Sequence, residues 1–391
     1  MKEPVADEDP IDLLVKSVPR HIWVTIIALA VMLATSWLFF KPPAPEIAGA
    51  ATGETLEGRV VTVLAEEEQL VAGQPQRVQR VIVAITRGRL AGQQVEALRG
   101  QTMMLTGATR VRPGDRVLLE RSIGADRETF YISDFVRWPT LLVLVALFVV
   151  AAVAVGRRVG LTALLSMSIS VLTVAGFILP GIMAGHDPLL VCMAGALLLM
   201  IASLYLIYGW TWKTHSALAG LTISLLATAT LAFLFGQLAR LSGLGSEEAG
   251  FLIHLGQFQV NPRGVLLGGI VLGAVGVLDD VAVGQASATF ELRRANPQLQ
   301  WMQLVRHSMA IGRDHIASMT NTLLLAYVGA SLPLFLLMAT LNIPPAQIVN
   351  REFIAEEIVR TLVGSLGLIL AVPATSLLAG LLAQRSELPP T

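Results

Sequence analysis

Long apolar stretches recur along this chain, and a membrane-spanning helix needs about 20 predominantly apolar residues. The stretches predicted to cross a bilayer are residues 22–40, 140–155, 161–180, 188–208, 217–235, 265–283, 318–341 and 359–382. The second is the shortest, but Trp138 and Pro139 precede it, and these residue types favour a membrane interface and a first helical turn. The pattern therefore predicts an α-helical polytopic membrane protein with about eight transmembrane helices.

The stretch between the first two predicted helices has a different character, because short runs rich in β-branched residues alternate with turn signals. The predicted strands are residues 56–64, 77–86, 101–106, 115–123 and 126–133. Five short strands in so small a segment indicate an extracytoplasmic β-barrel-like domain of the OB or SH3-like kind, over residues 46–136. Its many arginines could contact anions or phospholipid headgroups, but such charges more often form a solvated face, and we favour that interpretation.

Charged residues near the predicted helices indicate the orientation of the chain. If the N-terminus is inside, the short outer loops and helix borders hold few basic residues, namely Arg240, Arg263, Arg351 and Arg360. The positive-inside rule then places both termini in the cytoplasm. The predicted parts are a cytoplasmic segment (1–21), an anchor helix (22–40), a seven-helix membrane domain (138–384) and a cytoplasmic tail (385–391). An acidic leader before residue 22 favours an uncleaved anchor over a signal peptide.

Composition narrows the classes of partner. Hydrophobic residues make up 54% of the 391 positions, only 14% are charged, and the formal net charge is zero. Without a basic stripe interleaved with aromatics, nucleic-acid binding is excluded. The single cysteine, Cys192, cannot form an intrachain disulfide or a CxxC metal motif. The predicted partners are the lipid bilayer and a small ion or solute, with a homo-oligomer left open; no cofactor is expected and no metal is assigned.

Two adjacent acids, Asp279 and Asp280, lie inside the apolar stretch 265–283. Carboxylates are costly in a membrane segment, so they mark a candidate functional site. On a helix, Asp280 shares one face with four glycines, and we call this set the glycine face: Gly269, Gly273, Gly276, Asp280 and Gly284. We expect these glycines to let another helix pack closely and enclose Asp280. Asp279 points about a quarter-turn away, as an auxiliary group. The alternative is that Asp280 merely ties two helices together by a hydrogen bond.

A second polar cluster precedes and enters the stretch 318–341. Asp314, Ser318 and Asn321 share one helical face, and Arg313 and His315 flank it. One cytoplasmic connection joins this segment to the Asp280 helix, so we expect the two to pack together. Asp314 and Asn321 would then face Asp280 as ligands. The alternatives are that Asn321 only bonds to neighbouring helices and that Arg313 lies at the cytoplasmic interface. Near the outer end of the last helix, Glu356 and Arg360 are four residues apart and are predicted to form an ion pair.

Three runs carry a resemblance to a known family. They are Gly276-Val-Leu-Asp-Asp-Val-Ala-Val-Gly-Gln285, the run from Gly312 to Tyr327, and the run from Glu357 to Gly367. In this order they resemble the YibE/F family of bacterial membrane proteins, over most of the chain. The resemblance implies a protein of the bacterial plasma (inner) membrane with a transport function, but it supplies no substrate. The family usually has a single Asp followed by Val at Asp279-Asp280, and Asp280 best matches that acid.

Two classes of function follow from these residues. In the first, the protein is a membrane transporter in which Asp280 binds a cation or proton, while Arg313 leaves room for an anion such as phosphate. In the second, Asp280 and Asp314 form the acid pair of an intramembrane enzyme. The sequence lacks the His-Glu-x-x-His and Gly-x-Ser-x-Gly motifs, which makes an enzyme the weaker hypothesis. An accessory sensor subunit is a further alternative, but it would leave both polar clusters without a role.

Overall fold

The computed structural model describes residues 55–71, 74–100, 109–123, 128–254, 260–341 and 343–385. The predicted N-terminal segment and anchor helix, the strand 101–106 and almost all of the C-terminal tail lie outside these residues. The described residues fall into two compact units, which meet in the chain between Ala154 and Val155, and each is described by itself.

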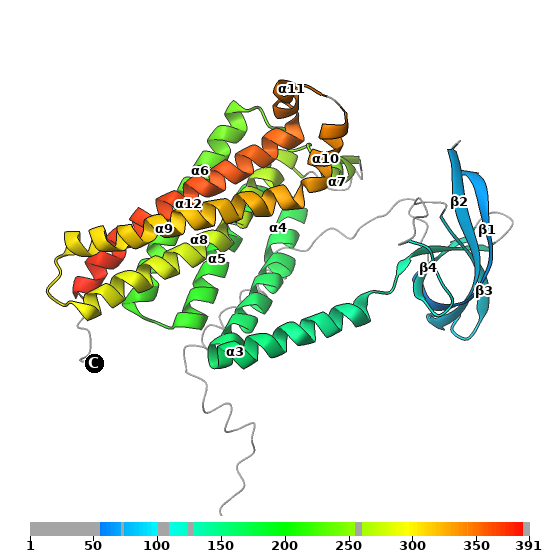
Figure 1. Ribbon diagram of the computed structural model, residues 1–391, viewed down its shortest axis with the longest axis horizontal. Coiled ribbons are helices and arrows are strands. Elements are labelled where there is room, and N and C mark those ends of the chain that lie inside the picture. Colours follow the sequence, from blue (N-terminus) through cyan, green and yellow to red (C-terminus); the bar gives the residue numbers. More distant parts are fainter. Residues whose placement is uncertain are drawn as a thin grey trace, which may run out of the picture. The chain divides into compact units, whose positions relative to one another are not determined.

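The first unit contains a closed five-stranded β-barrel (Figure 1). Its strands are β1 (Thr55–Val71), β2 (Gln74–Arg87), β3 (Gln94–Arg99), β4 (Arg116–Ile123) and β5 (Glu128–Phe135). They are ordered β1-β2-β3-β5-β4, and β3 pairs with β5 in parallel. Alternate residues of β2, namely Val81, Val83 and Ile85, point into the core, as the period of a strand requires. The prediction of a small barrel is confirmed, whereas its assignment to the OB or SH3-like kind stays a prediction.

Strand β3 is an element that the sequence analysis missed. Its inward positions include Ala97 and Arg99, so its pattern does not read as alternating large apolar residues. Arg99 is only 5% exposed, and its Nη1 donates hydrogen bonds to the carbonyl oxygens of Ile132 at 2.7 Å and Ser133 at 2.6 Å. Burial lowers the pKa of Arg99 from its usual value. Because an inward position of this strand holds a buried cation with backbone partners, the hydrophobic pattern did not predict the strand.

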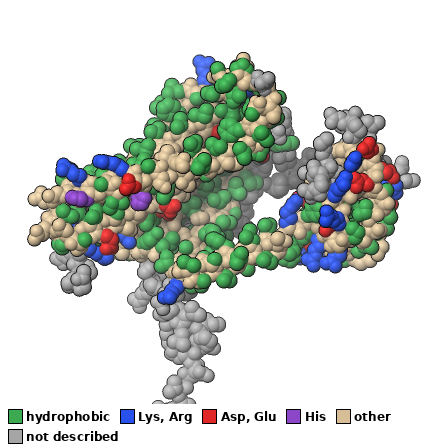
Figure 2. Space-filling view, viewed as in Figure 1, with side chains coloured by type: hydrophobic (Ala, Val, Ile, Leu, Met, Phe, Trp, Pro, Cys, Tyr) green, Lys and Arg blue, Asp and Glu red, His purple; other side chains and the backbone are tan. Residues whose placement is uncertain are grey.

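Most arginines on the barrel surface pair with acids on neighbouring strands or turns. Arg80 lies 2.7 Å from Glu96, and Arg110 lies 2.8 Å from Glu66. These pairs agree with the interpretation of a solvated charged face. Figure 2 shows charged side chains over the barrel, whereas hydrophobic side chains cover much of the helical unit.

The helices account for the rest of the described chain. Their bounds are α3 (Trp138–Thr173), η1 (Val174–Ile178), α4 (Leu179–Met183), α5 (Pro188–Tyr208), α6 (Trp212–Leu238), α7 (Glu247–His254), α8 (Pro262–Ala295), α9 (Trp301–Ala330), α10 (Leu332–Thr340), α11 (Pro345–Val349) and α12 (Glu352–Arg385). Within the described residues, six helices are long and apolar enough to span a membrane, or up to seven if the bent pair α9 and α10 is one span. A multi-pass membrane protein is therefore confirmed, and the total of eight stays a prediction.

The predicted stretches 140–155 and 161–180 are confirmed as two separate candidate spans, Trp138–Arg157 and Val159–Met183, because α3 breaks at Arg157, where φ is 48°. One predicted span differs from the structure in shape. The stretch 318–341 is not one straight helix, because α9 and α10 meet at an angle of 63°. Pro333 lies in the first turn of α10, where its missing N–H is tolerated, and this favours a new helix start at that point.

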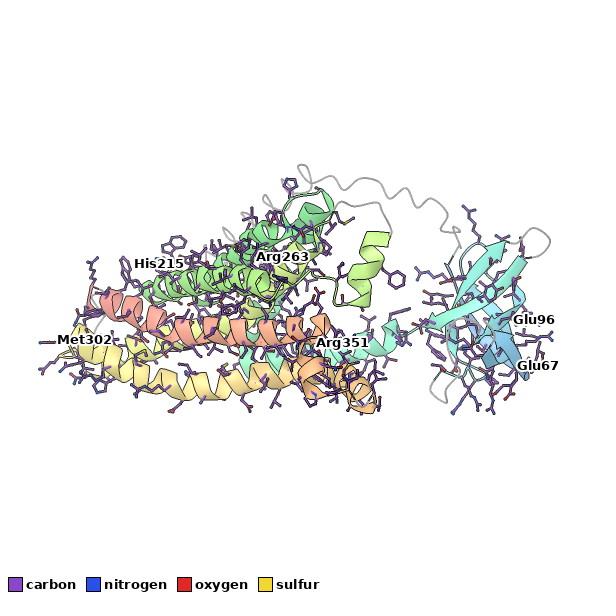
Figure 3. The ribbon with its side chains drawn as sticks, turned by 90° about the horizontal axis from the view of Figure 1, so that it is seen from above. Glu67, Glu96, His215, Arg263, Met302 and Arg351 are labelled. Carbon is purple, nitrogen blue, oxygen red and sulfur yellow. The ribbon has the colours of Figure 1, made fainter. Side chains whose placement is uncertain are left out.

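Helix α8 lies at the centre of the helical unit and packs against α5, α6, α9 and α12 (Figure 1). The core around it includes Val271, Leu278, Leu225 and Leu368, each with no exposed surface. Helices α6 and α12 form a close seam of small residues in which Gly220 lies against Thr375. Small residues allow helix backbones to approach closely in a membrane. Figure 3 places Met302 at one end of this unit and Arg351 at the other, and we name the two ends after these residues.

Candidate functional site

The glycine face of α8 is not covered by another helix of the described chain. A Cβ atom added at Gly276 would meet nothing within 4 Å. The close approaches of α8 are made by two other glycines, because a Cβ at Gly264 would lie 2.8 Å from Pro188 and one at Gly268 would lie 2.7 Å from the sulfur of Cys192. The expected packing role of Gly269, Gly273, Gly276 and Gly284 is thus taken by Gly264 and Gly268.

Only the tips of long side chains from α9 and α12 approach the glycine face. Measured from an added Cβ, Arg360 Nη1 lies 3.6 Å from Gly269, Tyr327 Oη lies 2.9 Å from Gly273, and His315 Cε1 lies 3.9 Å from Gly284. Each of these side chains carries a polar group. The face is therefore bordered by a row of polar side chains along the length of α8.

Asp280 is exposed at the middle of the glycine face. Within the described residues it takes part in no hydrogen bond and no ion pair. The alternative interpretation, in which Asp280 ties two helices together, is therefore not what the structure shows. A carboxylate on a membrane-length helix is left without a protein partner, although such a charge is costly against lipid.

Asp279 points into a different environment from its neighbour. It lines a cavity of about 210 Å³ between α3, α5 and α8, together with Ser170, Ser203 and Gly276. Its Oδ1 is buried and has no hydrogen-bond partner within the described residues. The two adjacent carboxylates thus lie in two different places, one on the exposed glycine face and one in the partly open cavity between α3, α5 and α8.

The residues predicted on α9 are only partly brought to this site. His315 borders the glycine face, and its Nδ1 is buried without a partner among the described residues. Arg313, Asp314 and Asn321 are exposed, and none of them bonds to Asp280. The last two lie about half a turn from the buried stripe that includes Gly312, so they are directed away from the helix core. Asp314 and Asn321 therefore do not face Asp280, and the residue of this cluster that approaches the glycine face is His315, next to Gly284.

A buried polar cluster on the Met302 side of Asp280 was missed by the sequence analysis. The Nε2 atom of Gln285 lies 2.7 Å from the carbonyl oxygen of Ser308 and 2.7 Å from the hydroxyl of Ser376. Thr289 also contacts the Ser308 hydroxyl at 2.7 Å, and all four residues have no exposed surface. This cluster ties α8, α9 and α12 together. Its sequence signal is a glutamine five positions after Asp280 in an apolar helix.

At the Arg351 end lies a cavity of about 960 Å³, which we call the vestibule. It is bounded by α7, α10 and the first turns of α8 and α12, and its lining includes Gly269, Glu356, Glu357 and Arg360. Because Gly269 also belongs to the glycine face, the vestibule opens onto one end of that face.

The ion pair in the vestibule differs from the predicted one. The Nε atom of Arg360 lies 3.4 Å from Oε1 of Glu357, three positions earlier on α12. Glu356 instead accepts a hydrogen bond from the backbone N–H of Gly245 at 3.2 Å. Both spacings bring side chains together on a helix. Glu356 bonds to the loop before α7, which leaves Glu357 as the partner of Arg360.

Within the described residues, no group of three or more His, Cys, Asp or Glu side chains could hold a metal ion. The comparisons with known proteins agree with the resemblance seen in the sequence. The model of the family described as YibE/F-like protein matches residues 144–385, which is more than half of the chain. No curated protein and no solved structure matches the chain.

Proposed function

We propose a transport function for this chain, which belongs to the YibE/F-like family and is a multi-pass membrane protein. In this proposal a small ion or solute moves along the glycine face of α8, and Asp280 is its binding residue. The vestibule is the entrance from the Arg351 end. The row formed by Arg360, Tyr327 and His315 supplies polar groups along the way.

One observation carries the proposal. Asp280 is an exposed, unpartnered carboxylate on a face of a membrane-length helix that no other described helix covers. A charge in that position is not left against lipid, because ionisable residues inside membranes face water or protein and mark ion pathways. Glycines beside it keep the backbone open to whatever passes. A water-filled path along this face satisfies both requirements.

The charges along the path favour a cation. Glu248, Glu356 and Glu357 outnumber Arg360 in the lining of the vestibule, and the one acidic or basic residue of the glycine face itself is Asp280. The anion alternative rested on Arg313, which is exposed and borders neither the vestibule nor the glycine face among the described contacts. Acidic linings attract cations and raise their local concentration. We therefore propose a cation or proton as the transported species.

The orientation of the chain belongs to the proposal. The basic residues of the short loops favour a plasma membrane protein with both termini in the cytoplasm. Arg293 and Arg294 in the last turn of α8 lie toward the Met302 end, which would then face the cytoplasm. The vestibule would open outside.

The test is flux in proteoliposomes made with the full chain. Asp280→Asn keeps the shape of the side chain and removes its charge, so we expect cation uptake to fall to the background of empty liposomes. Asp314→Asn is the matched control, because this exposed residue of α9 has no contact with the glycine face, and we expect it to keep normal uptake. The screen includes protons, monovalent and divalent cations, and phosphate for the anion alternative.

Gel filtration and thermal unfolding of both variants check that they fold like the unaltered protein. If Asp280→Asn transports normally, Asp280 is not part of the mechanism. If the two variants lose uptake equally, the glycine face has no special role.

A further inference from the structure

We propose that Asp279, Ser170 and Ser203 form a binding site for a sodium-sized monovalent cation, separate from the path past Asp280. This inference rests on the proposed transport function, for which the site would bind the coupling ion. The two carboxylates are consecutive in sequence, yet they serve different spaces on two sides of α8.

The geometry of the cavity supports a ligand site. Its volume of about 210 Å³ exceeds the roughly 30 Å³ that one water molecule occupies in the liquid, so an ion with a few waters fits. Asp279 Oδ1 is buried there with no hydrogen-bond partner within the described residues. A buried carboxylate oxygen without a partner is costly, and a bound cation would remove that cost.

The two serines have oxygen lone pairs to offer. Ser170 donates its hydroxyl hydrogen to the carbonyl oxygen of Ser166 at 3.1 Å, which leaves its oxygen free to accept. Ser203 receives a hydrogen bond from the Ser166 hydroxyl at 2.8 Å, which directs its remaining lone pair elsewhere. Ser166 thus orients both hydroxyls without lining the cavity itself.

The donor set indicates the class of ion. Carboxylate and hydroxyl oxygens are hard ligands, which suit hard cations and not the softer transition metals. Calcium takes six to eight oxygen ligands, with several carboxylates in its usual sites, whereas this cavity has one acid. One carboxylate balances one positive charge. A monovalent cation therefore fits the charge of the cavity.

Gly276 connects this cavity to the glycine face. It lines the cavity, and a Cβ at this position would meet nothing within 4 Å. An ion can therefore reach Asp279 past a residue that has no side chain. A cation at Asp279 would also weaken the repulsion between the neighbouring carboxylates, which links its occupancy to the charge of Asp280.

The experiment is thermal unfolding of the purified full chain in detergent. Sodium chloride is titrated against choline chloride at constant ionic strength, because a ligand that binds only the folded state raises Tm. We expect sodium to raise the Tm of the unaltered protein. Asp279→Asn should remove the rise, and Ser203→Ala should shift it to a several-fold higher sodium concentration.

Two matched variants are the controls. Asp280→Asn removes the neighbouring acid, and Ser168→Ala removes a hydroxyl of α3 that donates to the carbonyl oxygen of Leu164 and does not line the cavity. Ser168→Ala should keep the sodium-dependent rise unchanged, and Asp280→Asn should keep a rise but at a shifted sodium concentration, because the neighbouring charge is gone. The inference is overturned if the unaltered protein shows no sodium-specific rise, if a lower pH replaces sodium, or if Asp280→Asn removes the rise while Asp279→Asn keeps it.

A second measurement covers the case in which the Asp279 variant folds poorly. The chain has one cysteine, Cys192, which is only 5% exposed, so a new cysteine at Gly276 can be labelled selectively. We expect sodium, but not choline, to slow the reaction of Gly276→Cys with a water-soluble thiol reagent. Equal rates in both salts would contradict the site.

The outcomes separate this inference from the transport proposal. Loss of uptake in Asp280→Asn without any effect of sodium on Tm leaves transport in place and removes the Asp279 site. A sodium effect that depends on Asp279, with normal uptake in Asp280→Asn, retains the site and removes the proposed path.

Discussion

Two glycine-bearing surfaces of the helical unit look alike in sequence and differ in use. In the seam between α6 and α12, a Cβ at Gly220 would lie 2.8 Å from the Cα of Thr375, and a Cβ at Gly367 would collide with the side-chain hydroxyl of Thr228. On the glycine face of α8, a Cβ at Gly276 would meet nothing. In the seam, glycine has no side chain to keep the two helices apart, so their backbones approach closely. On the glycine face, the space that a side chain would fill at Gly276 stays empty.

The neighbours of the glycines explain the difference. Along α6, Ser224 and Thr228 have no exposed surface, and each donates its hydroxyl hydrogen to a carbonyl oxygen four positions earlier. These two hydroxyls are therefore satisfied within α6, and although Thr375 Oγ1 on the α12 side is buried without a hydrogen-bond partner among the described residues, none of these seam hydroxyls carries a charge. The glycine face includes Asp280, whose charge needs water or a counter-ion. The polarity of the residues beside the glycines, more than the spacing of the glycines, distinguishes a packing surface from a transport path.

The largest effect should come from filling the seam. Gly220→Val would place methyl groups against the backbone of Thr375, which cannot move away without shifting α12. Overpacking a well-packed core costs about 1–3 kcal/mol, and more where backbone must move. We expect a large loss of folded protein and a lower Tm. Gly276→Val is the matched control, with the same substitution on the glycine face, and it should fold normally. Equal losses would mean that the face is also a packing surface.

A smaller effect, seen in flux and not in folding, should come from filling the path. Gly276→Leu would put a bulky side chain beside Asp280 and in front of the Asp279 cavity. We expect uptake in proteoliposomes to fall several-fold while Tm stays near that of the unaltered protein. Gly329→Leu is the control, because Gly329 is exposed on α9 and an added Cβ there also meets nothing. Normal uptake with leucine at Gly276 would indicate that this face meets lipid.

These differences show what the sequence could and could not predict. The apolar stretches predicted the membrane class, and the helical spacing correctly grouped Asp280 with its four glycines. The spacing could not tell which glycines are covered, because Gly268 and Gly269 are adjacent in sequence and only the first packs against α5. That distinction depends on the rotation of α8 about its axis, which is set by all of its neighbours at once.

The site was predictable to a similar extent. Acidic residues in an apolar helix are conspicuous because burying their charge in a membrane is costly, so Asp279 and Asp280 could be found from their position in an apolar stretch. Their separate environments could not, since the serines of the Asp279 cavity come from α3 and α5, far away in the chain. The α9 residues were misplaced for a related reason. Asp314 and Asn321 share a face with each other, but a helical pattern does not say toward which neighbour that face turns.

The smallest effect should come from Gly284→Ala, and it tests the comparison most directly. The new methyl group would lie 3.9 Å from His315 Cε1, which is ordinary contact, and alanine is favoured over glycine in a helix interior by about 1 kcal/mol, so we expect normal uptake and no loss of stability. The measurement is Tm and uptake beside Gly367→Ala, which adds the same methyl group inside the seam and should lower Tm. A loss of folding from Gly284→Ala as large as that from Gly367→Ala would mean that something outside the described chain, such as a second copy, covers the glycine face. Asp280 would then lie in a helix interface, and the seam and the face would be two examples of the same packing.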